Sequence, residues 1–385
     1  MSATTTAING PDTSPNTGQP AEPPAKFVLI GAGWRSPYYL NPARRFPERW
    51  RVTSVVARSA ARARAVSERW GTPVARSLDE ALNLERPDFA VVAVPWAATP
   101  ECLRELTALG IPALSETPPA PDLPGLRDLW HDIGHQNLVQ VAEQYHRYPG
   151  HQARLAVIAS GRIGEVGRAS VSSTHQYHAM SLIRRYLSVG FEAAEVTGFA
   201  SAHPLIDPMD PAGWRPASAE TPVTTTFARL RFESGGVGHY DFTDNQWWNR
   251  LRGDRVLVRG SRGEIREDEV TALLEPKTIN TTALRRWQTG VEMNLEGFDL
   301  VHISLGEEIV YRNPWVGGRL ADDEIAVAEI MAGMAGWVRG GCGPGGPYPL
   351  AEGCQDHALA LAIDQSIAEG RTVRLETQPW AAGAK

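Results

Sequence analysis

Short apolar runs alternate with helix-like stretches along the first 150 residues of the chain. The apolar runs lie at residues 27–30, 52–57, 88–94, 112–115 and 138–142. The stretches between them carry helix composition and end signals at residues 60–70, 79–84, 100–109 and 123–135. Continuous apolar runs of this length are typical of strands buried on both faces, so the pattern predicts a parallel sheet covered by helices.

The first apolar run leads directly into a Gly-Ala-Gly turn and then a helix. Gly31 and Gly33 permit backbone angles and close approaches that a Cβ would block, and the N–H groups at a helix start point at any anion that lies there. We therefore predict a pyrophosphate-binding turn that also includes Trp34 and Arg35. Ser36 replaces the third glycine of the usual fingerprint, so a plain strand-to-helix turn is the alternative.

The ends of the predicted parallel strands meet at one rim, where open α/β sheets bind ligands. The residues expected at this rim are Gly31, Arg58, Ser59, Pro95, Trp96, Glu116 and Thr117. An NAD enzyme usually carries an acidic residue after the second strand, whereas an arginine followed by a serine suits a 2′-phosphate and favours NADP. A solvated arginine at a helix start is the other interpretation of Arg58.

After residue 150 the pattern changes to paired strands followed by two long helices. Residues 224–233 and 237–244 alternate on either side of Ser-Gly-Gly, which predicts a hairpin. Further strands are expected at residues 195–202, 255–265 and 269–274, and helices at 322–338 and 351–370. We predict that the Pro-rich segment 203–222 is a lid or a subunit arm, and residues 276–298 show no clear period.

Length and composition bound the class of protein. A chain of 385 residues is too long for one ordinary core and predicts two domains. Its 42% hydrophobic and 21% charged residues are typical of a globular protein, while a formal net charge of -6 argues against a nucleic-acid partner. No apolar run is long enough for a membrane span. Residues 1–25 are rich in Ser, Thr, Pro, Gly and Asn and are predicted to form a disordered tail.

Cysteine and lysine are both scarce. Cys102, Cys342 and Cys354 are too few and too scattered for a disulfide framework or a zinc site, which predicts a cytoplasmic location and no metal. Only three of the 38 basic residues are lysines, namely Lys26, Lys277 and Lys385. Almost no position can therefore supply a lysine ammonium to an active site.

Several motifs follow one another in a familiar order. After the glycine turn come a strand ending at Pro95, the segment Ser-Glu-Thr-Pro at 115–118, a strand ending near Gln144, and ASGRIGEV at 159–166. In this order the chain resembles the Gfo/Idh/MocA oxidoreductases. The segments VLVRGSRGE at 256–264 and ALALAIDQSIAEGRTVRL at 358–375 resemble the family's C-terminal strand-and-turn and its closing helix and strand.

The resemblance implies an α/β protein with an N-terminal Rossmann domain and a C-terminal α/β domain built on a large open, mainly antiparallel sheet. The expected boundaries are 26–149 for the first domain, 150–376 for a substrate and oligomerisation domain with its closing helix at about 351–370, and a tail at 377–385. NAD or NADP is the implied cofactor and a small carbohydrate the implied substrate. An open sheet face also predicts a homodimer or homotetramer.

Two positions depart from the family pattern. Family dehydrogenases typically carry Glu-Lys-Pro after the fourth strand, and its lysine acts with an aspartate and a histidine on the hydroxyl being oxidised. This chain has Glu-Thr-Pro, with Thr117 in the lysine position. His178 matches the family histidine, but Thr174 stands where the aspartate is expected. The resemblance therefore implies a divergent subgroup that lacks two of the three usual acid/base groups.

His175, Tyr177 and His178 form a titratable cluster just before an apolar helix expected at 180–187. Histidine near neutral pH and a tyrosine hydroxyl can both move protons, so these three residues are the catalytic candidates. If the segment is extended, His175 and Tyr177 share one face and His178 takes the other. Two surface histidines and a helix cap are the purely structural alternative.

Other candidates come from strand ends and loops. Gln144 is expected to bond the cofactor and Tyr145 to line the substrate side, with simple packing as the alternative for the tyrosine. Trp247 or Trp248 is predicted to stack on a sugar ring, although one of an adjacent pair in a strand must point into the core. Arg252 and Arg319 are candidates for holding an anionic group of the substrate.

Three functions stay open from the sequence. The first is hydride transfer at a ring hydroxyl of a sugar, with His and Tyr replacing the usual Lys/Asp/His set. The second is a redox-neutral NAD-dependent glycosidase, in which Tyr177 or His178 drives elimination after transient oxidation. The third is a non-catalytic nucleotide-binding relative.

Overall fold

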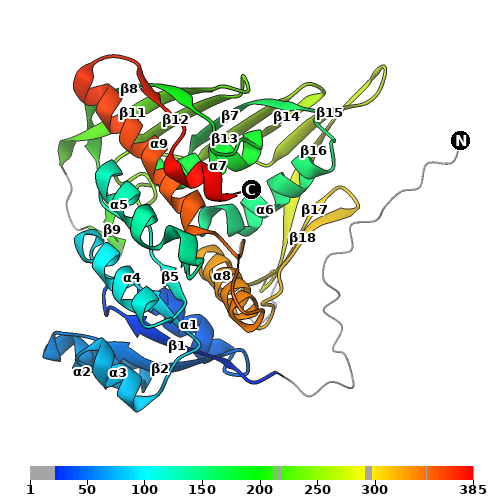
Figure 1. Cartoon of the computed structure of the whole chain (residues 1–385). Helices are drawn as coiled ribbons and strands as arrows, with labels where there is room; N and C mark the ends of the chain where they lie inside the picture. Colours follow the sequence, from blue (N-terminus) through cyan, green and yellow to red (C-terminus); the bar gives the residue numbers. More distant parts are fainter. Residues whose placement is uncertain (1–21, 211–212, 216–218, 291–296, 344, 385) are drawn as a thin grey trace, which may run out of the picture.

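The computed structural model describes residues 22–210, 213–215, 219–290, 297–343 and 345–384 (Figure 1). The predicted N-terminal tail lies outside the described residues except for positions 22–25. Two large sheets organise these residues, one of six strands and one of eleven, together with a small two-stranded ribbon.

The six-stranded sheet is parallel and has the order β3-β2-β1-β4-β5-β6. Its strands are β1 (Ala25–Ile30), β2 (Trp50–Val56), β3 (Val74–Ala75), β4 (Phe89–Val92), β5 (Ala113–Ser115) and β6 (Val139–Val141). The helices between them are α1 (Pro37–Arg45), α2 (Ala60–Trp70), α3 (Leu78–Leu84), α4 (Thr99–Ala108) and α5 (Leu123–Ile133). Phe27, Leu29 and Val91 in the central strands are fully buried, as continuous apolar runs allow. The predicted parallel sheet is confirmed.

The eleven-stranded sheet has the order β18-β17-β16-β15-β14-β13-β7-β12-β11-β8-β19 and is antiparallel except between β7 and β12. Its strands are β7 (Val166–Ser172), β8 (Ala194–Ile206), β11 (Glu220–Phe232), β12 (Val237–Thr243), β13 (Arg255–Gly260), β14 (Gly263–Arg266), β15 (Glu269–Glu275), β16 (Thr278–Thr289), β17 (Asp299–Leu305), β18 (Glu308–Arg312) and β19 (Val373–Leu375). The expected large, mainly antiparallel sheet is confirmed.

Four helices connect the two sheets into one body. They are α6 (Pro149–Ala159), α7 (Gln176–Leu187), α8 (Asp322–Arg339) and α9 (Leu350–Glu369). The helices α6, α7 and α9 pack on one face of the large sheet, while α8 packs against α1 of the Rossmann unit (Figure 1). The crevice between the sheets is therefore bordered by strand ends from one unit and by helix starts from the other.

The prediction of a Pro-rich excursion at 203–222 is largely wrong. The strand β8 continues to Ile206 and β11 begins opposite it at Glu220, with Pro204 paired to Pro222. Pro222 lies outside the part of β11 that pairs with β12, and Pro204 outside the part of β8 that pairs with β19, so neither removes a hydrogen bond to those strands. Between the two strands lies the ribbon of β9 (Met209–Asp210) and β10 (Gly213–Trp214), part of it outside the described residues.

Two further segments differ from the prediction. Most of residues 276–289, where no period was found, form β16. Nearly all side chains of this strand are exposed, so no apolar face produces an alternating pattern in its sequence. The expected tail at 377–385 contains the short helix η4 (Pro379–Ala384), in which Trp380 is fully buried. The indole N–H of Trp380 donates to Gln355 at 2.7 Å, so one large aromatic side chain anchors this end of the chain.

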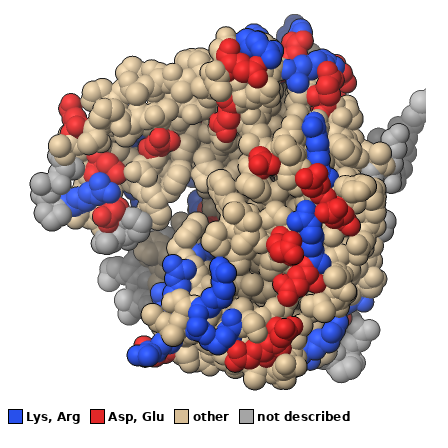
Figure 2. Space-filling view, turned by 60° about the vertical axis from the view of Figure 1, so that its left-hand side comes forward, with Lys and Arg blue, Asp and Glu red and all other residues tan. Residues whose placement is uncertain are grey.

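Among the described helices, none has the length and apolarity that a membrane crossing requires. Acidic and basic side chains are interspersed on the face shown in Figure 2, which carries no continuous basic stripe.

Candidate active site

The turn after β1 is shaped by one glycine that no other residue could replace. Gly31 has a φ of +119°, and a Cβ built there would lie 2.1 Å from the carbonyl oxygen of Ala93. Gly33, in contrast, faces open space, since a Cβ there would meet no atom within 4 Å. Gly31 lets the turn cross β4 closely, and Gly33 leaves its outer side accessible.

This turn presents unused backbone donors. The N–H groups of Gly33, Trp34 and Arg35 have no acceptor within the described residues, and no side chain caps the start of α1. Ser36 donates its hydroxyl to the carbonyl oxygen of Gly33 at 2.7 Å and so braces the turn itself. Free N–H groups at a helix start are what a pyrophosphate requires, so the residues present fit a dinucleotide.

Arg35 is tied to two carboxylates beside the turn. Its Nε donates to Glu116 at 2.7 Å, and its Nη1 donates to Asp323 of α8 at 2.8 Å. Burial lowers the pKa of Arg35, but the attraction of the two carboxylates outweighs it and the pKa lies well above the usual value. With its amide oriented to satisfy both ends, Gln144 accepts from Arg35 at 3.0 Å and donates to Ala142.

The remaining cofactor candidates lie at the rim as predicted. Arg58 is exposed at the end of β2, and Ser59 caps α2 by accepting from the N–H of Arg62 at 3.5 Å. Pro95 precedes the short helix η1 (Trp96–Ala98), whose Trp96 is half exposed. No acidic side chain follows β2, so the rim there carries a basic and a hydroxyl group.

A cavity of about 530 Å³ opens between the two sheets. Predicted site residues that line it are Trp34, Arg35, Trp96, Glu116, Thr117, Gln144, His175, Tyr177, His178 and Trp247. The sequence interpretation missed Gln176, Thr226, Tyr240, Phe242 and Asp244, which also line it. Positions 240, 242 and 244 share one face of β12 by the two-residue alternation of a strand, and that signal could have found them.

His178 forms a buried dyad with Glu143. The Nδ1 atom of His178 lies 2.6 Å from Oε2 of Glu143. His178 exposes 5% of its surface and Glu143 exposes 1%. Burial raises the pKa of Glu143 to about 8 and lowers that of His178 to about 3. Near neutral pH the pair is therefore uncharged, with the carboxyl proton shared toward the imidazole. The hydrogen bond to Glu143 uses Nδ1, no hydrogen bond joins Nε2 to a described residue, and His178 lines the cavity.

His175 and Tyr177 form a second pair beside the dyad. Nε2 of His175 lies 2.9 Å from the hydroxyl of Tyr177, and burial, followed by the proximity of His178, lowers the pKa of His175 to about 3. Burial raises the pKa of Tyr177 far above its usual value, against an opposing hydrogen bond with Thr117. The tyrosine therefore stays protonated at neutral pH and acts as a hydrogen-bonding group.

The helix that carries this cluster begins earlier than predicted. α7 starts at Gln176, so Tyr177 and His178 lie in its first turn and the expected alternation across a strand is wrong. The N–H of Gln176 donates to the hydroxyl of Tyr240 at 3.0 Å, a contact with β12 that stabilises the helix start. Thr174, at the position of the family aspartate, is fully buried and does not line the cavity.

Other predicted residues lie away from the cavity. Tyr145 packs behind His178 with ring centroids 4.4 Å apart, and it stacks on Tyr148 at 4.7 Å. Trp248 is 40% exposed, and Arg252 is exposed with a bond to the neighbouring Leu251 carbonyl. Arg319, in the left-handed region at φ 52°, also does not line the cavity.

Glu143 is the functional candidate that the sequence did not reveal. It stands two residues after the end of β6, next to Gln144. A glutamate at a strand end is normally solvated, and its partner histidine lies 35 residues further along the chain. The two side chains meet because α7 packs against residues 145–147, directly after Glu143.

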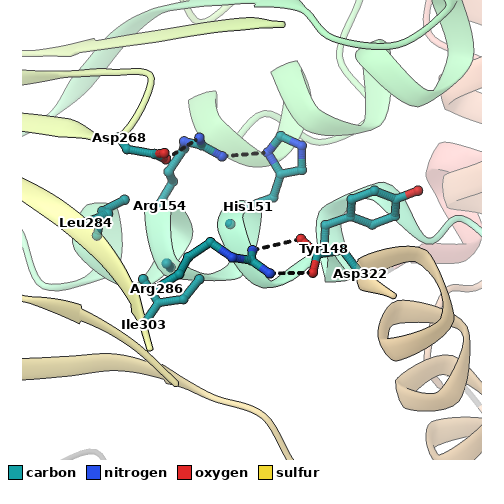
Figure 3. Close-up of a pocket in the computed structure, with 10 residues that line it drawn as sticks. Tyr148, His151, Arg154, Asp268, Leu284, Arg286, Ile303 and Asp322 are labelled. Carbon is teal, nitrogen blue, oxygen red and sulfur yellow. Dashed lines mark hydrogen bonds and ion pairs between the residues drawn. The ribbon is translucent and has the colours of Figure 1, made fainter. Parts of the chain in front are cut away.

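A second, smaller cavity of about 190 Å³ lies between α6, the strands β16 and β17, and the start of α8. Figure 3 shows its charged groups in pairs. Arg286 makes two hydrogen bonds of 2.7 and 2.8 Å to Asp322, and Arg154 donates to Asp268 at 2.8 Å. His151, also on its wall, shares a 2.6 Å hydrogen bond with the hydroxyl of Tyr186.

The strand order of the small sheet, its glycine turn and the cavity at the strand ends define a dinucleotide-binding α/β protein. Residues 25–145 match the model of an oxidoreductase family described as having an NAD-binding Rossmann fold, Gfo/Idh/MocA. The Rossmann unit of this chain therefore matches a family that binds a nicotinamide dinucleotide.

Solved structures extend the similarity to both units. A levoglucosan dehydrogenase in complex with NADH and levoglucosan has a TM-score of 0.63 at 18% identity, with 91% of this chain and 99% of that chain covered. A myo-inositol dehydrogenase from Corynebacterium glutamicum has a TM-score of 0.62 at 18% identity over 92% and 99%.

An oxidoreductase from Agrobacterium radiobacter, in complex with NAD+, L-tartaric acid and magnesium, has a TM-score of 0.64 at 16% identity over 91% and 98% of the two chains. No curated protein sequence matches the chain. At these identities the structural similarity establishes the shared two-sheet fold.

Proposed function

We propose that the protein is a nicotinamide-dependent dehydrogenase or reductase that acts on a ring hydroxyl of a sugar or sugar derivative. The observation that carries the proposal is the His178–Glu143 dyad, whose histidine lines a cavity next to the dinucleotide turn. Similar folds occur in dehydrogenases of inositol and levoglucosan, which supports the polyol substrate class. The dyad takes the place of the lysine and aspartate that Thr117 and Thr174 replace.

The proton path follows from the hydrogen bond within the dyad. When Glu143 is protonated it donates to Nδ1 of His178, so the neutral imidazole carries its own proton on Nε2. Loss of one proton from the pair leaves a carboxylate that accepts from Nδ1–H, and Nε2 then has a free lone pair. In that state Nε2 can take the proton of a substrate hydroxyl. In the state with Glu143 protonated, Nε2 carries a proton that it can donate to a carbonyl oxygen.

The groups around the dyad orient the substrate. Tyr177 stays protonated and, beside Thr117 and His175, supplies hydrogen bonds to the reacting oxygen. The free N–H groups of the turn at Gly33, Trp34 and Arg35 would hold the pyrophosphate. When bound, the cofactor supplies a nicotinamide carbon that accepts or donates the hydride.

A turnover assay tests this function. Purified protein is mixed with NAD or NADP and a panel of neutral sugars and cyclitols, and the absorbance of the reduced nicotinamide is followed. We expect oxidation of at least one polyol, with a lower KM for NADP if Arg58 and Ser59 hold a 2′-phosphate. A protein that binds neither nucleotide contradicts the proposal.

The redox-neutral glycosidase is the alternative enzyme, and the same assay separates the two. A glycosidase releases the aglycone with no net change in nicotinamide absorbance. Its elimination step needs a base next to the substrate, and the raised pKa of Tyr177 makes that tyrosine a poor one. A non-catalytic relative binds the nucleotide and turns over neither kind of substrate.

The remaining predictions complete the proposal. Residues 26–149 form the dinucleotide domain and residues 150–376 the substrate domain. The face of the large sheet opposite the helices is the surface through which we expect a homodimer or homotetramer to form. A cytoplasmic location stays a prediction, in keeping with the three free cysteines.

A further inference from the structure

Three exposed tryptophans line the active-site cavity. Trp34, Trp96 and Trp247 line the cavity and expose 78%, 50% and 46% of their surface. They come from the turn after β1, the start of η1 and the loop after β12. Exposed apolar surface of this extent gathered at one cavity is unfavourable in water and usually marks ligand contact.

Two of these indoles are held in place by other rings. Trp247 stacks on Phe242 with ring centroids 5.1 Å and planes 14° apart, and its edge meets His175 at 5.3 Å. Trp96 meets Tyr177 edge to face at 6.2 Å. Packing already orders these side chains. When a flat group stacks on their free surface, the tryptophans therefore lose little further conformational entropy.

The same cavity has no unpaired basic group among its described lining residues. The guanidinium of Arg35 is bound by Glu116 and Asp323, and burial keeps His175 and His178 neutral at pH 7. Asp244 also lines the cavity, and its carboxylate has no ion pair or hydrogen bond to a described residue. A substrate anion would therefore meet an uncompensated negative charge without a cation to balance it.

We infer that the substrate is an uncharged glycoside whose aglycone carries an aromatic ring, with this ring stacked on Trp247 and the sugar ring beside His178. The inference rests on the proposed function of the same site and narrows its substrate class. A free sugar has no aromatic ring to stack on the tryptophans. Sugar phosphates and uronates bring an anion next to Asp244.

Calorimetric titration of the full-length protein, saturated with NADH, tests the inference without turnover. The probes are phenyl and methyl β-D-glucopyranoside, the corresponding galactopyranosides, and glucose 6-phosphate with its parent sugar. We expect at least one phenyl glycoside to bind about tenfold more tightly than its methyl counterpart, which is the size of one good stacking contact. The 6-phosphate should bind more weakly than the unphosphorylated sugar.

Variants assign the preference to Trp247. Trp247→Ala should bring the phenyl-to-methyl ratio close to one, and Trp247→Phe should keep part of the preference. Trp248→Ala is the matched control, since Trp248 is the next residue, is 40% exposed and does not line the cavity. It should leave the ratio unchanged.

Equal affinities for phenyl and methyl glycosides overturn the inference, as does the absence of phenyl glycoside binding or tighter binding of the 6-phosphate. Preferential binding of a phenyl glycoside without any oxidation leaves the ligand class standing and removes the proposed function. Oxidation of free sugars without a phenyl preference supports the proposed function and overturns the inferred ligand class.

Discussion

The two cavities of this protein differ in what their charged groups have left to offer. In the smaller cavity Arg286 and Asp322 satisfy each other, and so do Arg154 and Asp268. In the larger one His178 is buried against a glutamate that is itself neutral near pH 7, and no hydrogen bond joins its second ring nitrogen to a described residue. Both cavities hold a histidine and several charges, but only in the larger is a histidine bonded to a carboxyl group that can exchange a proton with it, since His151 contacts a tyrosine hydroxyl instead.

The difference teaches that pairing, rather than the presence of titratable groups, separates a reactive pocket from a structural one. In a complete ion pair the donors and acceptors bond each other and are not available to a ligand. A dyad whose proton is shared across a 2.6 Å contact keeps one exchangeable proton and one open nitrogen. Substitutions in each cavity can break or sharpen this contrast.

The largest effect is expected from His178→Ala, because it removes the only nitrogen that the dyad presents to substrate. We expect kcat to fall by about 10³-fold with NADH affinity unchanged, as is typical for the loss of a general base. Steady-state kinetics together with calorimetric NADH titration measures both quantities. Activity within tenfold of the parent protein would exclude His178 from proton transfer.

Glu143→Gln should lower kcat by about 10²-fold, since the amide keeps a hydrogen bond to Nδ1 but cannot lose a proton. In the parent protein we expect polyol oxidation to rise with pH through the pKa of about 8 that burial gives Glu143, and ketone reduction to fall through the same range. The variant should lose both transitions. A glutamine variant with the parent pH profile would contradict the role of Glu143 as the positioning residue.

The same carboxyl should appear in the pH dependence of stability. Its pKa is higher in the folded than in the unfolded chain, so between the unfolded value and about 8 the unfolded state binds fewer protons and stability falls as pH rises. His178 has the opposite sign, but its contribution is complete above its unfolded pKa of about 6.5. From pH 6.5 to 8 we expect chemical denaturation to show a loss of unfolding free energy about 2 kcal/mol larger in the parent protein than in Glu143→Gln.

Tyr177→Phe should have a smaller effect, a loss of about threefold to tenfold in kcat. The hydroxyl stays protonated and contributes a hydrogen bond rather than a proton, so only that bond is lost. The pH profile should keep its midpoint. A shift of the midpoint would show that Tyr177 takes part in the titration.

The smallest effect belongs to the other cavity. Arg286→Ala breaks the double hydrogen bond to Asp322, but both side chains are 35% exposed, so the free energy of unfolding should fall by only about 0.5 kcal/mol. kcat and KM should match the parent protein. A tenfold loss of activity would show that the smaller cavity is coupled to catalysis.

The part of the molecule that the sequence predicts well is the part specified by local pattern. The apolar runs around Phe27 and Val91 required a buried parallel strand, and Gly31 required the turn that follows. The rim residues Arg35, Glu116 and Thr117 then follow from the rule that strand ends converge.

The part that sequence could not predict depends on contacts between distant segments. The start of α7 is stabilised by the hydroxyl of Tyr240, 64 residues away, and this contact converts an expected extended segment into a helical turn. The same docking buries Glu143 against His178, and burial rather than composition determines their pKa values. Trp380 shows the same effect at the chain end, where a predicted tail is held by one buried indole.

The ion pair between Arg35 and Asp323 joins the dinucleotide turn to a helix from the other half of the chain. Any ligand that binds more tightly when Arg35 is held in place must, by reciprocity, strengthen the attachment of α8 to the Rossmann unit. Cofactor affinity and the cohesion of the two halves are therefore linked by one coupling free energy, which can be measured from either side.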